Sequence, residues 1–184
     1  MHASKHHKIV FAGPVGAGKT TAIEALSDIE PVRTEANPTD EVAKLKNNTT
    51  VALDYGVLNL GNGEKIMLYG TPGQSRFSFM WDIVTEGGIG LVLLINNRRP
   101  DPLHDLREFM KAFDRFVRRT ACVIGITHCD GARTPDLADY RKALADLRLP
   151  SPVPVFQVDA RRSADIAAMV KALLFTLDPM QQDA

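Results

Sequence analysis

The sequence predicts an α/β fold: a doubly wound, mostly parallel six-stranded sheet with one antiparallel strand and with helices on both faces. Three observations lead to this prediction. A glycine-rich loop stands between a short apolar segment and a segment that can form a helix. Farther along the chain, apolar runs of strand length alternate with stretches of helical periodicity. One turn signal between two apolar runs predicts a hairpin, which makes one strand antiparallel to its partner.

The glycine-rich loop is Gly13-Pro14-Val15-Gly16-Ala17-Gly18-Lys19-Thr20, which matches the phosphate-binding pattern G-x-x-x-x-G-K-[ST] (the P-loop). Segment 8–12 is expected to form a buried strand before it, and a helix is expected from Lys19 to about Ile29. Glycines allow backbone N–H groups to turn toward phosphate oxygens, and the helix N-terminus adds partial positive charge. A turn that binds nothing is the alternative, and the strand–loop–helix context disfavours it.

The P-loop supplies most of the expected phosphate contacts. Lys19 is expected to neutralise the β- and γ-phosphates, and Thr20 to offer its hydroxyl to Mg²⁺. The residues expected to bind phosphate are Gly13, Val15, Gly16, Ala17, Gly18, Lys19, Thr20 and Thr21.

Segment 28–48 is polar, is interrupted by Pro31 and Pro38, and shows no periodicity, so we expect a long loop that covers a bound nucleotide. Strands are expected at 50–60 and 64–69, joined by the turn Gly61-Asn62-Gly63. The run 89–95 is the most apolar in the chain, as suits a strand buried on both faces.

The second half of the chain continues the strand–helix alternation. Apolar residues recur at helical spacing over 103–116, and strands are expected at 121–127 and 153–158. Thr134 is expected to cap a helix with Pro135 at its first position, and Ser163 to cap a last helix that ends before Pro179. Right-handed crossovers then place the P-loop at the carboxyl ends of the parallel strands.

Composition limits the classes of function. The 184 residues favour a single domain, and 22 basic against 22 acidic side chains give no bulk charge that favours nucleic acid or an anionic membrane. Residues 1–7 are expected to form a flexible leader. The sequence shows no signal segment, no myristoylation glycine at position 2 and no prenylation cysteine near its end. We therefore expect no direct membrane anchor, so that any recruitment to a membrane would need a partner.

The two cysteines are Cys122 and Cys129. On one strand they would lie ~23 Å apart, too far for a disulfide. Two reduced thiols and the lack of an export signal predict a cytoplasmic protein.

Five segments together carry a resemblance to a known family: the P-loop, Thr50-Val-Ala-Leu-Asp-Tyr-Gly56, Gly70-Thr-Pro-Gly-Gln74, Thr127-His-Cys-Asp130 and Asp159-Ala-Arg161. With the element order, they resemble the Ras-like small GTPase superfamily, and within it the bacterial branch of MglA-like and roadblock-associated GTP-binding proteins. The resemblance spans nearly the whole chain. It implies one P-loop NTPase G domain over 1–184 that binds Mg²⁺ with GTP or GDP.

The same resemblance implies a molecular switch that hydrolyses GTP slowly and controls a partner, with a roadblock-domain protein as GTPase-activating protein or effector. Two alternatives stay open. One is a guanine-nucleotide-binding module with negligible hydrolysis, and the other is a P-loop ATPase or kinase. Comparing the affinities for GTP and ATP separates the last reading from the others.

The resemblance also assigns roles around the terminal phosphate. Thr50 corresponds to the threonine that binds Mg²⁺ and the γ-phosphate, with Thr49 as the competing candidate. Gly73 corresponds to the glycine whose N–H binds the γ-phosphate, and Gln74 to the glutamine that orients the attacking water. Arg76 is a candidate for a catalytic arginine in cis, as is Arg33; each is also readily explained as a surface arginine.

Asp130 corresponds to the carboxylate that accepts hydrogen bonds from N1–H and the exocyclic amine of guanine. Thr127 stands where most relatives have asparagine, and His128 replaces the usual lysine, so an imidazole would lie along the base. The backbone N–H of Ala160 would bind guanine O6, and Arg161 would cover the base. The base-reading motif is therefore an imperfect match.

Two further departures affect the phosphate end. Gly70 stands where Ras-like proteins carry an aspartate that holds a Mg²⁺-bound water, so we expect weaker magnesium coupling in the GDP state. Val15 stands where many relatives have glycine, and a branched side chain there would crowd an arginine finger. We therefore expect slow intrinsic hydrolysis.

Overall fold

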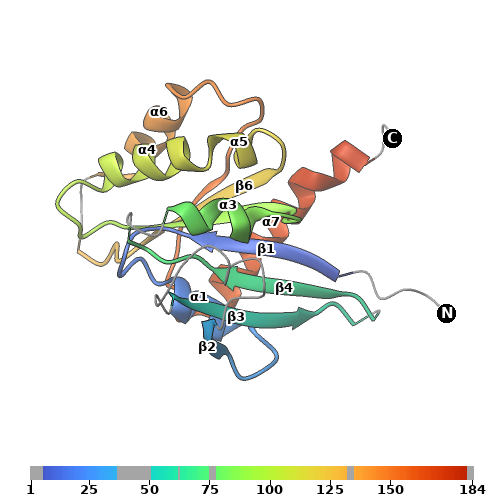
Figure 1. Ribbon diagram of the computed structural model, residues 1–184. Coiled ribbons are helices and arrows are strands. Elements are labelled where there is room, and N and C mark those ends of the chain that lie inside the picture. The colour runs from blue at the N-terminus through green and yellow to red at the C-terminus, as the bar shows by residue number, and fades with distance from the viewer. Residues whose placement is uncertain (1–5, 37–50, 62, 75–77, 132–134, 182–184) are drawn as a thin grey trace.

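The computed structural model describes residues 6–36, 51–61, 63–74, 78–131 and 135–181. The strands among them form one twisted seven-stranded sheet in the order β2-β3-β4-β1-β5-β6-β7 (Figure 1). The strands are β1 (His6–Ala12), β2 (Val32–Ala36), β3 (Val51–Asn59), β4 (Lys65–Gly70), β5 (Gly90–Asn96), β6 (Ala121–Thr127) and β7 (Val155–Gln157). Strand β3 is antiparallel to both of its neighbours, and the other pairings are parallel.

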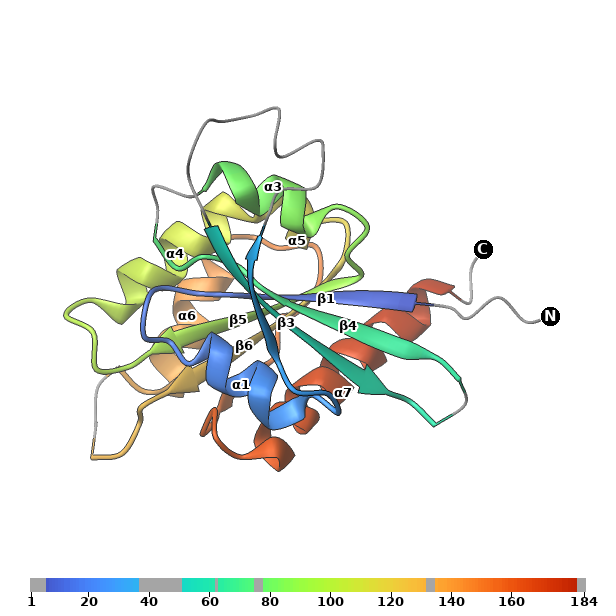
Figure 2. The same cartoon turned by 60° about the horizontal axis from the view of Figure 1, so that its bottom comes forward.

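Helices cover both faces of the sheet, and each face has its own cluster of buried apolar side chains beneath them. The helices are α1 (Lys19–Leu26), α3 (Phe79–Thr85), α4 (Pro102–Ala112), α5 (Asp114–Val117), α6 (Leu137–Ala145) and α7 (Ser163–Gln181). Apolar side chains of α1 and α7 pack on one face, where the two helices lie side by side (Figure 2). Side chains of α3, α4, α5 and α6 pack on the other face. Among the described helices, none is both long and apolar enough to cross a bilayer.

The centre of the sheet fixes the position of the P-loop. Strand β1 lies between β4 and β5 and is parallel to both. The loop after β1 therefore lies at the point where the chain connections to the two halves of the sheet run in opposite directions. Strands β5 and β6 are buried on both faces almost throughout, as their continuous apolar runs predict. The carboxyl end of β1, where the P-loop lies, is the position at which α/β sheets bind ligands.

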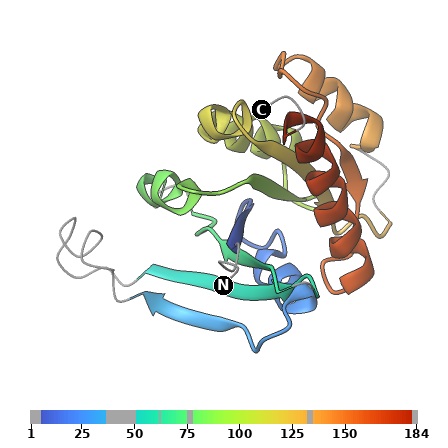
Figure 3. The ribbon, with the colours of Figure 1, turned by 90° about the vertical axis from the view of Figure 1, so that its right-hand side faces the viewer.

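The predicted fold class is confirmed, with one strand more than expected. Val32–Ala36 forms β2 and pairs antiparallel with β3, from Val32 opposite Tyr55 to Ala36 opposite Val51, inside the segment predicted to be a loop. Figure 3 shows β2 and β3 at the outer edge of the sheet. An edge strand is held by backbone hydrogen bonds on one side, so polar side chains do not prevent it from forming.

Several predicted boundaries were wrong. His6 and His7 belong to β1, where they pair with Lys65 and Ile66, so they are not part of a flexible leader. The periodic segment 103–116 forms two helices rather than one, with Phe113 between α4 and α5. Helix α6 begins at Leu137 with Asp136 as its cap, because the Asp136 carboxylate accepts hydrogen bonds from Ala138 N and Asp139 N. The predicted cap, Thr134, lies outside the described residues.

The predicted limits of α7 also differ from the structure. Ser163 is the first residue of the helix rather than its cap, since the carbonyl of Arg162 accepts the first helical hydrogen bonds. The helix does not end before Pro179 but continues to Gln181. A proline in a last turn removes only one helical donor, so the chain keeps its helical course.

Candidate functional site

The P-loop has the backbone geometry that a phosphate cradle needs. Gly13 has φ +142°, and a Cβ there would lie 2.1 Å from the carbonyl oxygen of Leu94. Gly18 has φ +95°, and a Cβ there would lie 2.9 Å from the Cβ of Ala160. Both positions therefore require glycine, and the second brings the loop after β7 against the P-loop.

Lys19 is the buried cation of the P-loop. Its Nζ donates to the carbonyl oxygens of Gly13 at 2.7 Å and Pro14 at 2.9 Å, and the residue is 8% exposed. Burial lowers the pKa of Lys19 to about 8, and the nearby Asp54 carboxylate opposes this only in part. Before phosphate binds, the Lys19 ammonium therefore begins to lose its proton near pH 8.

This pKa predicts a pH-dependent affinity. Phosphate would stabilise the protonated form of Lys19, so we expect GDP to bind more weakly as the pH rises through about 8, by up to about tenfold per pH unit. Titrations of GDP between about pH 7 and about pH 9 measure the effect. The variant Lys19→Arg keeps its charge over this range and should give a flat profile. An equal slope in that variant would contradict the assignment.

A carboxylate that the sequence analysis missed lies beside Thr20. The Thr20 hydroxyl donates to Asp54 Oδ2 at 2.5 Å, and Asp54 stands opposite Gly70 in the β3–β4 register. A Cβ on Gly70 would lie 3.0 Å from the Asp54 Cβ. A carboxylate thus lies directly across the strand pair from position 70, although Gly70 itself carries none.

These residues fit a magnesium ion. Mg²⁺ prefers oxygen ligands and is usually held by one or two carboxylates together with phosphates and waters. The Thr20 hydroxyl, in the first turn of α1, and the Asp54 carboxylate, in β3, offer such oxygen ligands side by side. Among the described residues no group of three or more His, Cys, Asp or Glu gathers in a metal-binding cluster. The expected ligand Thr50 and its competitor Thr49 lie outside the described residues, so their roles stay predictions.

The loop that follows β4 packs on the P-loop and is held from behind by an aromatic cluster. A Cβ on Gly73 would lie 2.6 Å from Val15 N and 2.9 Å from Lys19 Nζ. The Trp81 indole N–H donates to the Pro72 carbonyl at 3.1 Å, and its ring stacks on Phe113 with centroids 5.1 Å apart. Gly73 is therefore next to the place where a terminal phosphate would meet Lys19.

Other predicted residues near this loop are placed less directly. Gln74 follows Gly73 and is exposed, and Val15 is 54% exposed on the surface of the P-loop. Arg33 lies in β2 rather than in a loop. Arg76 lies outside the described residues, so its catalytic role stays a prediction.

A cavity of about 690 Å³ opens next to the P-loop. Three segments far apart in the sequence meet there: the P-loop, the segment after β6 and the segment after β7. Its lining includes Gly16, Gly18, Thr21, Arg98, Thr127, His128, Asp130, Ala160 and Arg161. The structure thus brings the residues predicted to read a base to one cavity beside the phosphate loop.

Thr127 joins the base-reading segment to the P-loop. Its buried hydroxyl lies 3.0 Å from the Ala17 carbonyl oxygen and 3.2 Å from that of Ile95. His128 has a left-handed backbone, φ +58°, and its Nδ1 lies 3.0 Å from the Thr127 hydroxyl. Within the described part of the chain, no hydrogen bond or ion pair holds the Asp130 carboxylate, which lines the cavity.

The opposite side of the cavity carries a closed ion pair. The Arg161 guanidinium donates to the Asp159 carboxylate through Nε at 2.9 Å and Nη2 at 2.7 Å. These hydrogen bonds hold the pKa of Asp159 well below its usual range. Asp159 is thereby occupied, whereas Asp130 stays available to a ligand. Next to Asp159, the backbone N–H of Ala160 donates to no backbone carbonyl in the described turns and loops.

A curated protein resembles about half of the chain. The chain is 36% identical over 89 residues to the uncharacterized protein MJ1339 of Methanocaldococcus jannaschii, a match over 47% of this chain and 49% of that protein. The chain therefore spans about half the length of the curated relative it matches.

Two solved structures share the fold. The small GTPase Arl6 BBS3 of Trypanosoma brucei, with a bound nucleotide analogue, superposes with a TM-score of 0.72 at 14% identity, over 95% of this chain and 99% of that one. The G domain of the FeoB iron transporter of T. maritima gives 0.61 at 18% identity, over 92% and 98%. At these identities the likeness shows the fold alone, that of a P-loop GTPase G domain.

A sequence-family model described as "Conserved hypothetical ATP binding protein" matches residues 30–176, which is most of the chain. With the P-loop and the cavity beside it, this match supports a nucleotide-binding P-loop NTPase. The protein belongs to the family of conserved hypothetical ATP-binding proteins.

Proposed function

We propose that the protein binds guanine nucleotides with Mg²⁺ and hydrolyses GTP slowly as a molecular switch. The observation that carries the proposal is the Asp130 carboxylate, which lines the cavity beside the P-loop and forms no hydrogen bond or ion pair with another described residue, although it is close enough to attract Arg161. Guanine offers N1–H and an exocyclic amine on one edge, and a carboxylate can accept both. Adenine offers no such pair of donors, so a free acid at this position favours GTP over ATP.

The phosphate end supports the switch. Lys19 would exchange its hydrogen bonds to the Gly13 and Pro14 carbonyls for phosphate oxygens. A terminal phosphate would meet the backbone of Gly73, which packs on the P-loop beside Lys19. Its loss on hydrolysis would release this loop and, by the resemblance, the segment around Thr50.

Hydrolysis would depend on a water oriented by Gln74. Because that side chain is exposed and the branched Val15 is exposed on the P-loop, where it would crowd an arginine finger, we expect slow turnover without help. Stimulation would come from a partner, for which the sequence resemblance implies a roadblock-domain protein, or from Arg76 in cis. Bound Mg²⁺ would neutralise charge on the phosphates, with Thr20, Asp54 and Thr50 as its proposed protein ligands.

The test of this function is direct. The affinities of nucleotide-free protein for GDP and ADP, measured by calorimetry, separate a guanine site from the adenine site that the family description suggests. Single-turnover hydrolysis of GTP, with and without a roadblock-domain partner, then separates a switch from a binding module without hydrolysis. Tighter binding of ADP than GDP would overturn the proposal in favour of the ATPase reading.

The magnesium site gives a prediction of its own. In Asp54→Asn the side chain keeps its shape and its contact with Thr20 but loses its charge. We therefore expect the increase in GDP affinity that Mg²⁺ causes to be roughly several-fold smaller than in the wild type. GDP dissociation with and without a chelator measures this. Asp28→Asn is the matched control. The Asp28 carboxylate accepts a hydrogen bond from the N–H of Asn59 at 2.7 Å, and Asn59 ends β3, the strand that contains Asp54. An unchanged magnesium response in Asp54→Asn would remove Asp54 from the site.

A further inference from the structure

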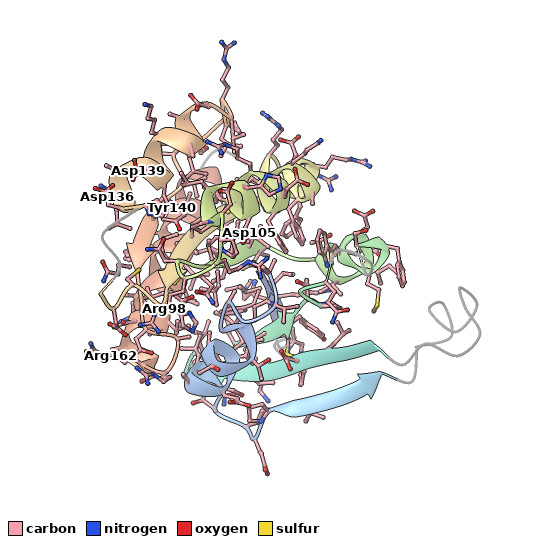
Figure 4. All side chains as sticks on the ribbon, turned by 90° about the vertical axis from the view of Figure 1, so that its left-hand side faces the viewer. Arg98, Asp105, Asp136, Asp139, Tyr140 and Arg162 are labelled. Carbon is pink, nitrogen blue, oxygen red and sulfur yellow. The ribbon has the colours of Figure 1, made fainter. Side chains whose placement is uncertain are left out.

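Arg98 lies at the same edge of the sheet as the proposed base-reading residues, although no sequence motif marks it. It follows β5, and its side chain lines the cavity of about 690 Å³ that also contains Asp130. Figure 4 views this edge and labels Arg98 together with Arg162, which comes from the loop before α7. What Arg98 contacts in the cavity suggests a role in reading the base.

The backbone around Arg98 is held from several sides. The Asn96 side chain donates to the Gly16 carbonyl at 3.1 Å and accepts from the Arg98 N–H at 2.9 Å. The Asn97 N–H donates to the Thr127 carbonyl at 2.9 Å, and the Asn97 side chain accepts from the Tyr140 hydroxyl at 2.6 Å. Arg98 therefore starts from a fixed point between the P-loop and the end of β6.

From this point the guanidinium reaches the base-reading segment. Arg98 Nη2 donates to the main-chain carbonyl oxygen of Asp130 at 3.1 Å. The bond engages the backbone of Asp130 and leaves its carboxylate open to the cavity. Arg98 thus fixes the residue whose side chain would receive the base, without competing for that side chain.

The charges around the cavity set Arg98 apart from the other arginines that line it. Arg161 pairs with Asp159 at 2.7 Å, and Arg162 lies 3.8 Å from Asp165. Among the described residues Arg98 forms no ion pair with a carboxylate, and its guanidinium donates a hydrogen bond to a main-chain carbonyl oxygen. His128, which stands where relatives carry lysine, has its Nδ1 engaged with Thr127. Arg98 is therefore the unpaired cation of the cavity in the described part of the chain.

We propose that Arg98 is a positioning residue for base selectivity: its hydrogen bond to the Asp130 carbonyl holds the Asp130 carboxylate where it can accept two donors from guanine. This inference rests on the proposed guanine site. It goes beyond that site because it assigns part of the selectivity to the loop after β5. Without Arg98 the P-loop contacts would persist, whereas the fine reading of the base edge would be lost.

The test compares GDP with IDP, whose hypoxanthine base has N1–H but lacks the exocyclic amine. In the wild type we expect GDP to bind roughly tenfold or more tightly than IDP, the value of one hydrogen bond to a charged acceptor. In Arg98→Ala we expect this ratio to fall to about two or less, because the carboxylate is no longer held against both donors. Arg98→Lys, which keeps a charged donor, should recover part of the ratio.

Arg99→Ala is the matched control. Arg99 is the next residue but forms an ion pair with Asp105 and does not line the cavity, so its loss should leave the ratio unchanged. A purely structural role for Arg98 would weaken GDP and IDP equally and leave the ratio as in the wild type, and that result would overturn the proposal. If wild-type protein binds GDP no more tightly than ADP, the guanine site itself fails, and the role of Arg98 fails with it.

Discussion

The variant Lys19→Met is expected to weaken GDP binding by on the order of a hundredfold or more, while the nucleotide-free protein stays at least as stable as the wild type. The two effects differ because Lys19 is buried before any phosphate arrives, and burial lowers its pKa from 10.5 to about 8. Methionine has a similar length and brings no charge into this environment. Calorimetric titration measures the first effect, and thermal unfolding without nucleotide measures the second.

The sign of the stability effect follows from linkage. Because the folded pKa of Lys19 lies below its unfolded value, the unfolded chain binds the proton more strongly, and the nucleotide-free wild type should gain stability as the pH rises from about 8 to 10.5. Lys19→Met should lack this gain. Lys8→Met is the control: Lys8 is also partly buried, but its Nζ donates to the Glu86 carbonyl, away from the P-loop. A Lys8→Met variant that lost GDP affinity to the same extent would show that the effect is not local to the phosphate site.

The second large effect is expected at Asp130. In Asp130→Asn the carboxamide offers both an acceptor and a donor, and xanthine carries an oxygen where guanine carries the amine. We therefore expect affinity for GDP to fall by about tenfold to a hundredfold and XDP to become the preferred ligand. Competition between GDP and XDP measures the change.

The control for this exchange is Asp146→Asn, since Asp146 is exposed at the end of α6 and does not line the cavity. That variant should keep the preference for GDP. If Asp130→Asn weakens GDP and XDP alike, the carboxylate does not read the base edge, and the guanine assignment falls.

The core of the fold was predictable because its signals are local. Strands β5 and β6 are continuous apolar runs, and the P-loop motif fixes a strand before it and a helix after it. Strand β2 has no such signal, because Val-Arg-Thr-Glu-Ala carries three polar residues in a row and pairs on one side only. Its existence depends on β3 being next to it, which is information about tertiary structure.

The position of Asp54 shows where sequence reasoning could have gone further. Counting outward from the centre of the Gly61-Asn62-Gly63 turn pairs residue 54 with residue 70, which is the register that the structure shows. The aspartate that is missing at position 70 could thus have been sought directly across the hairpin. Arg98 gives no comparable signal, because its contact with Asp130 joins segments 32 residues apart and depends on the packing of β5 beside β6.

Trp81 is the single tryptophan of the chain, and its indole donates to Pro72, next to the glycine that packs on the P-loop. The only strong natural fluorophore of the protein is therefore hydrogen-bonded to the segment that the proposed switch would rearrange. Its emission would report that rearrangement in real time, without a label and against no background from other indoles.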